Sequence, residues 1–242
     1  MFDTLSIVKT PAAARKLFPA ALWKVRTREK KVYLTFDDGP IEDVTPAILD
    51  ELNKYNAKAT FFCIGKNIAA NPGIFQRISA EGHTIGNHTQ DHLNGWQTKN
   101  EIYYRSIEKC AENLMKKEIK FPGFNNRNPF LISAISLSSA SSMKFKAPNL
   151  KFFRPPYGKL TLTQYNYLKK FYKIVMWDVL AFDFDLKVTK EQVLDNVLKN
   201  TAPGSIVVFH DSLKAKEKVL YALPKVLEHY SSLGYRFESL VG

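Results

Sequence analysis

Lys31–Pro40, with the sequence KVYLTFDDGP, is the stretch of the chain that decides its fold. Residues 31–36 are rich in β-formers and alternate weakly in polarity, which is typical of a buried strand. Asp37 and Asp38 follow at the end of this strand, and Gly39-Pro40 then breaks the chain. Because α/β proteins place functional polar side chains at the carboxyl ends of their strands, the stretch predicts a first strand that ends in part of a functional site.

Apolar strands alternate with amphipathic helices along the rest of the chain. Ala59–Ile64 and Ser205–Phe209 are predicted strands, and Glu101–Lys117 is a predicted long helix with an apolar stripe. Thr45 and Pro46 indicate another helix start, with Thr45 as the N-cap and Pro46 in the first helical position. Strands that alternate with helices of about ten to fifteen residues are typical of βαβ units. The sequence therefore predicts an α/β fold with a parallel sheet or barrel.

The chain of 242 residues is long enough for one full-sized domain, with two small domains as the alternative. Residues 1–29 are predicted to be a basic N-terminal extension, and residues 30–242 the main domain. Within this domain, residues 124–149 are rich in serine and carry no charge from Asn128 to Met143. We interpret this segment as an insertion on the outside of the fold, and the alternative is a lid or an extra wall of the site.

The formal net charge of the chain is +12, and the first 31 residues contribute +6 of it, with eight Lys or Arg against Asp3 and Glu29. Such a field favours an anionic partner, and a solvated basic face without a dedicated partner is the alternative. Leu17, Phe18, Leu22 and Trp23 lie among these cations and could rest on an anionic membrane surface. The alternative is a helix that covers the open end or side of the barrel. No motif for nucleic acid accompanies the charge, so a nucleic acid partner is not expected.

Export and membrane-spanning signals are not visible in the sequence. No window holds the roughly eighteen uninterrupted apolar residues of a membrane span, and the N-terminus lacks the basic start and apolar core of a secretory signal. We therefore expect a cytoplasmic or membrane-associated protein, with the cell envelope as the alternative location. Cys63 and Cys110 form no CxxC pair, which gives no support to a cysteine-based metal or redox site.

A predicted strand over Gly82–Ile85 leads into His88–His92, HTQDH. Two histidines four residues apart would lie on the same side of one helical turn, where their ring nitrogens can converge on one ion. A chance pair is the alternative, because this spacing alone is a weak signal. An aspartate from the first strand would complete a set of two His and one carboxylate, which suits Zn²⁺ or another divalent transition ion with open positions.

Polar residues also follow the later predicted strands. Arg154–Gly158, RPPYG, forms a rigid turn with one arginine and one aromatic residue. Asp178 and Asp183 follow the next strand. His210 ends the strand after it, and histidine is the natural proton donor near neutral pH. Alone, such a histidine is more often a surface or capping residue.

Together these segments resemble the five motifs of the polysaccharide deacetylase family, also called the NodB-homology family or carbohydrate esterase family 4. The resemblance covers about residues 30–240, and the five motifs occur in order along the chain, which makes a chance match implausible. The five segments are Thr35–Pro40 (TFDDGP), His88–His92 (HTQDH), Arg154–Gly158 (RPPYG), Trp177–Phe184 (WDVLAFDF) and Val207–His210 (VVFH).

The resemblance implies a distorted (β/α) barrel of about seven parallel strands with a metal at its C-terminal mouth. By similarity, Asp38, His88 and His92 bind this divalent metal ion, for which we expect Zn²⁺, with Co²⁺ or another transition ion as the alternative. Asp37 would be the general base for the attacking water, and Arg154 would hold Asp37 ionised and in place.

The remaining roles follow from the same resemblance. The backbone N–H of Tyr157 would help to hold the tetrahedral oxyanion. His210 would protonate the departing amine, and Asp183 would orient His210. Contacts with the substrate are predicted for Pro156, Trp96, Phe184 and Val207.

Two positions depart from the family pattern. The fourth motif usually ends in Asp-Trp, whereas here Phe184 follows Asp183, so a ring is retained and an indole hydrogen bond is lost. The fifth motif usually begins with Leu, whereas this chain has Val207, which could resize the pocket for the acetyl methyl group. Trp96 could stack on the face of a sugar, and a partly buried core tryptophan is the alternative.

The predicted function is that of a metal-dependent hydrolase that removes N-acetyl groups from an N-acetylated sugar or polysaccharide of the peptidoglycan or chitin type. Two alternatives stay open. One is an amidohydrolase that acts on a small non-sugar amide, and the other is a catalytically silent relative that binds carbohydrate or membrane. The sequence disfavours the silent relative, because every predicted ligand and base position is filled.

Overall fold

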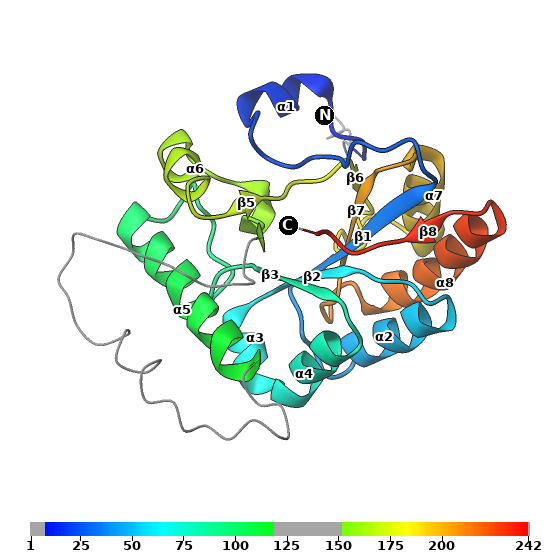
Figure 1. The fold of residues 1–242 in the computed structure, drawn as a ribbon, viewed down its shortest axis with the longest axis horizontal. Coiled ribbons are helices and arrows are strands. Elements are labelled where there is room, and N and C mark those ends of the chain that lie inside the picture. Colours follow the sequence, from blue (N-terminus) through cyan, green and yellow to red (C-terminus); the bar gives the residue numbers. More distant parts are fainter. Residues whose placement is uncertain (1–7, 119–151, 242) are drawn as a thin grey trace.

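β1 (Lys31–Asp37) lies inside a parallel sheet, with β2 on one side and β7 on the other (Figure 1). In the computed structural model, which describes residues 8–118 and 152–241, the strands follow the order β5-β4-β3-β2-β1-β7-β6, and every neighbouring pair is parallel. β8 pairs in parallel with the beginning of β1. The other strands are β2 (Thr60–Cys63), β3 (Thr84–Asn87), β4 (Phe152–Phe153), β5 (Lys173–Ile174), β6 (Val179–Leu180), β7 (Ile206–His210) and β8 (Arg236–Phe237). The predicted barrel of about seven parallel strands is confirmed.

Helices surround the strands on their outer side (Figure 1). The buried cluster that joins the two layers includes Leu34 and Phe36 of β1 and Leu49 of α2. Because alternate residues of a strand point to opposite faces, Thr35 and Asp37 point away from this cluster into the barrel. The helices are α1 (Ala12–Leu17), α2 (Thr45–Lys54), α3 (Gly65–Ala70), α4 (Pro72–Ala80), α5 (Asn100–Glu118), the 3-10 helix η3 (Pro156–Gly158), α6 (Leu162–Leu168), α7 (Lys190–Asn200) and α8 (Lys216–Ser232).

The N-terminal segment, residues 8–25, fills the gap between β5 and β6, the two ends of the strand order. The backbone N–H of Leu22 donates to the carbonyl of Ile174 in β5 at 2.8 Å, and the N–H of Leu180 in β6 donates to the carbonyl of Val8 at 2.9 Å. The side chain of Leu22 packs against a buried cluster. The segment therefore covers the open side of the barrel, as one of the two alternatives expects, but it does so through extended residues on either side of α1 and not through a helix, because α1 buries none of its residues.

Asp178 anchors this N-terminal segment. Its carboxylate is fully buried, with Oδ1 accepting a hydrogen bond from Arg15 at 2.6 Å and Oδ2 accepting one from the hydroxyl of Ser205 at 2.6 Å. The Nζ atoms of Lys9 and Lys24 lie 3.7 and 3.9 Å from Oδ2. The sequence groups Asp178 with the polar residues at strand ends, and the structure shows that it holds the N-terminal segment.

Two local features differ from the sequence predictions. Val44 is the N-cap of α2, and Thr45 is its first residue, so the prediction of Thr45 as N-cap is wrong. The hydroxyl of Thr45 instead donates to the carboxylate of Asp211 at 2.7 Å, a long-range partner that local spacing does not reveal. The helix α3 is not predicted at all, because its six residues are too few to show a helical repeat.

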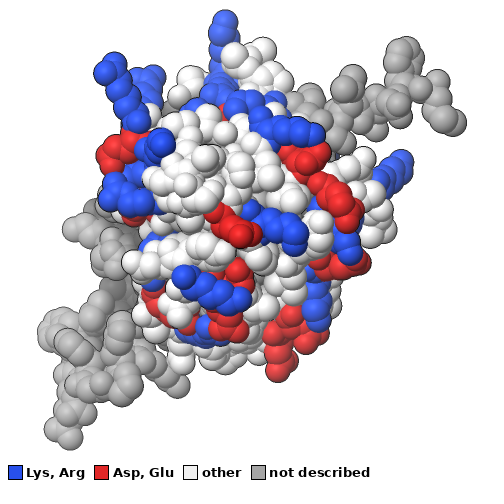
Figure 2. Space-filling model, turned by 90° about the vertical axis from the view of Figure 1, so that its right-hand side faces the viewer, with Lys and Arg blue, Asp and Glu red and all other residues white. Residues whose placement is uncertain are grey.

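Positive side chains are scattered over the face of the protein on which α8 lies. Figure 2 shows Lys and Arg interspersed with Asp and Glu over this face, so the charge there is not gathered into one basic patch. Among residues 8–118 and 152–241, no helix combines the length and the apolar character needed to cross a membrane. The predicted insertion, residues 124–149, lies outside the described residues.

Candidate metal centre with an acid and a base

The carboxyl ends of the parallel strands meet at one mouth of the barrel, where three predicted metal ligands come together. Asp38 follows β1, His88 follows β3, and His92 lies in the loop beyond. The Nε2 atoms of His92 and His88 lie 3.1 and 3.7 Å from Oδ1 of Asp38. One ligand atom from each residue lies within 4.8 Å of the other two. The three side chains therefore converge on one point.

The atoms of this cluster suit a divalent cation. Oδ1 of Asp38 is buried, and no group in the described residues donates a well-aligned hydrogen bond to it. Nδ1 of His88 lies 2.7 Å from the carbonyl oxygen of Arg154. Because a carbonyl can only accept, Nδ1 carries the proton and Nε2 keeps its lone pair on the side of Asp38. An unpaired buried carboxylate oxygen beside a free imidazole lone pair is an arrangement that a metal ion stabilises.

The protonation states of the cluster agree with this assignment. Burial lowers the pKa of His88 to about 4, so its imidazole is neutral at pH 7. In Asp38, burial favours the protonated form, but contact with His92 and the positive charge of His210 outweigh burial and hold the pKa of this carboxyl well below its usual range. A neutral imidazole and an ionised carboxylate are the forms that bind metal ions.

The loop that carries the two histidines is not helical, so the prediction of one helical turn is wrong. Thr89 and His92 have φ angles of 64° and 56°, in the left-handed region. Asn87 fixes the loop, because its Oδ1 accepts from the N–H of Thr89 at 2.9 Å and its Nδ2 donates to the carbonyl of Ile107 in α5 at 2.8 Å. These contacts, and not the four-residue spacing of the histidines, determine the conformation of the loop. The rings of His88 and His92 nevertheless lie close together, with their centroids 5.1 Å apart.

Asp37, the last residue of β1, has one oxygen bound and one open. Oδ1 accepts a hydrogen bond from Arg154 at 2.7 Å, and no hydrogen bond within the described residues reaches Oδ2. Arg154 is fully buried, and its other donors reach the hydroxyl of Thr35 at 2.7 Å and the carbonyl of Met176 at 3.0 Å. Its guanidinium also lies 4.1 Å from the centre of the Phe62 ring. Arg154 therefore holds the Asp37 carboxylate in one orientation and leaves Oδ2 to accept a proton.

His210, at the end of β7, is paired with Asp183. Its Nδ1 lies 2.8 Å from Oδ1 of Asp183, and its backbone N–H donates to Oδ2 of the same carboxylate at 2.7 Å. Burial disfavours the imidazolium, but the charge and hydrogen bond of Asp183 outweigh it and raise the pKa of His210 to about 9. His210 is therefore cationic at neutral pH. Because Asp183 occupies Nδ1, Nε2 is the nitrogen left to give a proton.

Two aromatic rings lie beside histidines of this site. The ring of Tyr157 lies 4.5 Å from that of His92, and the ring of Phe184 lies 4.9 Å from that of His210. Trp96 is 63% exposed, which shows that it does not belong to the core. Its indole N–H donates to the carbonyl of Leu160 at 2.9 Å, which fixes the ring at the surface.

The two other predicted substrate contacts are buried. Pro156 opens η3, in which Tyr157 has a φ of 59° and a side chain exposed to solvent. The oxyanion role of the Tyr157 N–H stays a prediction. Val207 is fully buried in the cluster between the sheet and the helices, so the structure does not bring its side chain to the exposed part of the site.

Two polar residues of the site have no role in the sequence predictions. Asp211 is 1% exposed, and its carboxylate accepts a hydrogen bond from the N–H of Gly39 at 2.8 Å. Asn67 of α3 donates through Nδ2 to the carbonyl of Asp38 at 2.6 Å. The position of Asp211 directly after His210 is a signal that could have pointed to it, whereas Asn67 offers no comparable signal.

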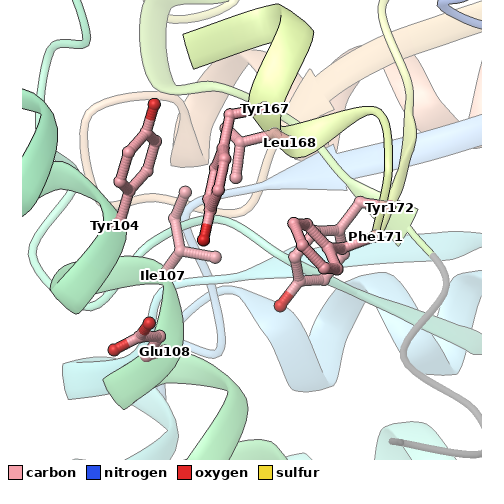
Figure 3. Close-up of a pocket in the computed structure, with 7 residues that line it drawn as sticks. All are labelled: Tyr104, Ile107, Glu108, Tyr167, Leu168, Phe171 and Tyr172. Carbon is pink, nitrogen blue, oxygen red and sulfur yellow. The ribbon is translucent and has the colours of Figure 1, made fainter. Parts of the chain in front are cut away.

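A separate hollow lies between α5 and α6 and contains none of the predicted site residues (Figure 3). Tyr104 of α5 and Tyr167 of α6 both line it, and their rings are in contact with centroids 4.4 Å apart. The side chains that line it are Tyr104, Ile107, Glu108, Tyr167, Leu168, Phe171 and Tyr172. The candidate chemistry therefore lies at the barrel mouth and not in this hollow.

Comparisons with known proteins agree with the geometry. The sequence profile of the family described as "Polysaccharide deacetylase" matches residues 24–125. A peptidoglycan-N-acetylglucosamine deacetylase of Bacillus cereus is 34% identical over 212 residues, which cover 87% of this chain and 66%, about two thirds, of the relative. A chitooligosaccharide deacetylase of Azorhizobium caulinodans is 30% identical, with 82% of this chain and 81% of the relative covered. The crystal structure of a peptidoglycan N-acetylglucosamine deacetylase in complex with 4-naphthalen-1-yl-N-oxidanyl-benzamide superposes with a TM-score of 0.76 and 31% identity, covering 96% of this chain and 95% of that one.

Proposed function

Because the chain belongs to the polysaccharide deacetylase family, we propose that it is a metal-dependent hydrolase that removes N-acetyl groups from an N-acetylated sugar or polysaccharide of the peptidoglycan or chitin type. One observation carries the proposal. Three metal-ligand groups, the open carboxylate oxygen of Asp37 and the cationic imidazole of His210 lie together at one mouth of the barrel. Amide hydrolysis needs an electrophile on the carbonyl oxygen, a base for water and an acid for the amine.

Asp38, His88 and His92 would hold the metal ion. Two imidazoles and one carboxylate suit Zn²⁺, with Co²⁺ as the alternative. When bound, such an ion polarises the acetamide carbonyl and lowers the pKa of a bound water. The contact of His88 Nδ1 with the carbonyl of Arg154 supports this role, since it fixes the ring with Nε2 on the side of Asp38.

Asp37 would take the proton of the attacking water through Oδ2. Arg154 occupies Oδ1, so the carboxylate cannot rotate freely and offers one oxygen in one direction. A base held in this way transfers protons from a fixed position, and general base catalysis contributes roughly 10²–10⁴-fold to the rate. Arg154 thus acts by positioning Asp37.

His210 would give its Nε2 proton to the departing amine. An amide nitrogen is a poor leaving group until it is protonated, and a cationic imidazole supplies that proton at neutral pH. Asp183 keeps His210 in the protonated form and in one ring orientation. The backbone N–H of Tyr157 is our proposed donor to the tetrahedral oxyanion.

The rings of Tyr157 and Phe184 beside the site, together with the exposed ring of Trp96, support a carbohydrate substrate. Tyr157 and Trp96 are both exposed, and such rings offer flat apolar faces with a polar edge. Phe184 adds a ring beside His210. A substrate of the peptidoglycan type would place the working enzyme at the cell envelope.

The experiment that tests this proposal is an acetate-release assay against chitooligosaccharides, peptidoglycan fragments and small non-sugar N-acetyl amides. We expect release from an N-acetylated glycan, loss of release with EDTA, and recovery when Zn²⁺ or Co²⁺ is added back. Release from the small amides alone would support the amidohydrolase alternative. Binding of a glycan without acetate release, in protein loaded with metal, would support the silent relative.

An anionic membrane surface is a second proposed partner, on the strength of one exposed apolar residue. Leu17, at the end of α1, is 65% exposed beside the exposed cation of Lys16. Leu22 and Trp23 pack against the protein instead. We therefore expect the substitution Leu17→Asp to abolish binding to vesicles that contain anionic lipid. Absence of binding by the unaltered protein would end this second proposal.

A further inference from the structure

Asp38, a proposed metal ligand, lies in a short turn. One residue from a distant part of the chain, Asp211, forms hydrogen bonds with the residues on both sides of Asp38. The backbone N–H of Asp211 donates to the carbonyl of Asp37 at 3.0 Å. The carboxylate of Asp211 accepts from the N–H of Gly39 at 2.8 Å. Asp211 therefore holds the residue before Asp38 and the residue after it.

The backbone conformation of Asp38 explains why such a grip is needed. Its φ is 88°, outside the regions that non-glycine residues normally adopt, and a residue in such a conformation persists when its surroundings hold it there. Asn67 adds one bond to the carbonyl of Asp38 at 2.6 Å, and the N–H of Ile64 donates to the carbonyl of Gly39 at 3.0 Å. Within the described residues, the side chains of Asn67 and Asp211 both bind the turn. Asp211 also comes directly after His210, the proposed acid, in the sequence.

The second oxygen of Asp211 ties the turn to the start of α2. Oδ2 accepts from the hydroxyl of Thr45 at 2.7 Å, and the same hydroxyl accepts from the N–H of Ile41 at 2.8 Å. Both carboxylate oxygens of Asp211 are thus bound within the protein. Neither oxygen is left without a partner, so we assign Asp211 a role through the backbone that it holds.

The packing around the turn leaves no spare room. A Cβ atom added to Gly39 would lie 1.8 Å from Oδ2 of Asp211, far inside van der Waals contact. The absence of a side chain at Gly39 is what lets the carboxylate approach the backbone. The close contact between Gly39 and Asp211 therefore connects the residue after β7 to the turn that contains Asp38.

From these contacts we infer that Asp211 is a positioning residue that holds Asp38 in its metal-binding geometry. Because Asp211 follows His210 directly, it also fixes the position of the proposed metal centre relative to His210. The inference rests on the proposed function, since it concerns the affinity of the same site for its metal. Residues that orient a metal ligand from behind typically change metal affinity by about 10–100-fold when they are removed.

The test compares the zinc affinity of Asp211→Ala with that of the unaltered protein, measured by competition with a chromophoric chelator. We expect a loss of about 10-fold or more in affinity. Asp211→Asn keeps an acceptor for the N–H of Gly39, so we expect a loss of only a few-fold. Asp43→Ala, which removes an exposed carboxylate near the same turn, is the matched control and should keep the original affinity.

Thermal unfolding of the metal-free variants separates positioning from general stability. The inference predicts that Asp211→Ala stays folded at 25 °C and still loses affinity. Unchanged affinity in folded Asp211→Ala would overturn it. If Asp211→Ala does not fold, Thr45→Val and Thr45→Ser replace it. The first removes the hydroxyl donor to Asp211 and should weaken zinc binding, and the second keeps the hydroxyl and should not; equal affinities for the two would overturn the inference.

A double-variant cycle tests the packing directly. Gly39→Ala should weaken zinc binding strongly in the unaltered background, because the added methyl group collides with Asp211. In the Asp211→Ala background the three atoms nearest to the added methyl group are removed, so the same change should weaken binding much less. Equal losses in both backgrounds would contradict the proposed fit. If the unaltered protein binds no zinc at all, the proposed function fails, and that outcome differs from zinc binding that Asp211 does not affect.

Discussion

Two buried aspartates, Asp37 and Asp178, each lie against an arginine and yet serve different ends. Asp37 is bound by Arg154 at 2.7 Å through one oxygen, and its other oxygen has no hydrogen-bond partner in the described part of the chain. Asp178 is bound by Arg15 at 2.6 Å, and its other oxygen is bound by the hydroxyl of Ser205. The first carboxylate is left with the capacity to accept a proton, whereas the second is fully used.

The two arginines also differ in their surroundings and in the part of the structure to which they belong. Arg154 is itself fully buried and anchored to main-chain carbonyls, so it can hold Asp37 without closing the site. Arg15 belongs to the N-terminal segment, and its bond to Asp178 anchors that segment to the barrel. An Asp–Arg pair by itself therefore does not mark an active site. The proposed role of Asp37 as the base depends on the oxygen that Arg154 leaves open.

The largest expected effect comes from the substitution Asp37→Asn. It keeps an oxygen for Arg154 but removes the base, so we expect kcat/KM for acetate release to fall by about 10²–10⁴-fold. The fall should far exceed any loss of folded protein, measured by circular dichroism on the same samples. A variant that keeps more than a tenth of the original activity would contradict the role of Asp37.

Asp178→Asn should act on stability rather than on chemistry. It leaves Arg15 without its buried counter-charge, and because Arg15 is about one-third exposed we expect a loss of about 2 kcal/mol in the free energy of unfolding, below the figure for fully buried pairs. Urea unfolding measures this loss. The folded fraction should retain the original kcat. A loss of kcat without a loss of stability would show that Asp178, like Asp37, takes part in the chemistry.

The pH dependence of the reaction should report His210. Because its pKa is raised to about 9, the proposed acid is protonated at neutral pH, and kcat should decline as the pH rises through about 9. Asp183→Asn removes the main cause of the raised pKa, so this decline should move to lower pH. A decline at the same pH in both proteins would mean that another group controls it.

The same pKa predicts a stability effect with a definite sign. The folded-state pKa of His210 lies above its unfolded value of about 6.5, so the stabilising contribution of its pair with Asp183 is fully present below pH 6.5 and is lost as the pH rises through about 9. Unfolding measured across that range should show the loss in the unaltered protein. Asp183→Asn should lack it.

The smallest expected effect concerns the exposed ring of Trp96. Trp96→Ala should raise KM for an oligosaccharide by a few-fold, as expected for the loss of about 0.5–1.5 kcal/mol of aromatic contact, and leave kcat within about two-fold. Steady-state kinetics on a soluble N-acetylated oligosaccharide measure both constants. An unchanged KM would show that the substrate does not touch this ring.

Much of the barrel mouth is predictable from the sequence because its residues follow strands. Asp37 and Asp38 end β1 and His210 ends β7, and the shared edge of parallel strands brings such positions together. Family resemblance then separates the ligand from the base, which adjacent aspartates alone do not allow.

The features that the sequence does not predict depend on contacts between distant parts of the chain. The left-handed loop between His88 and His92 is set by Asn87 and its bond to α5. The role of Asp211 depends on Gly39, 172 positions away along the chain. The closing role of residues 8–25 depends on Asp178, which looks like a site residue until its partners are known. Local periodicity cannot reveal any of these contacts.

The most direct test of the metal-dependent deacetylase is a zinc titration of metal-free protein with acetate release from an N-acetylated glycan as the readout. We predict no release without metal, a rise to full activity at one zinc per chain, and no comparable rise in His92→Ala. Acetate release that is independent of added metal, or that is restored equally in His92→Ala, would contradict the assignment of Asp38, His88 and His92 as the metal centre.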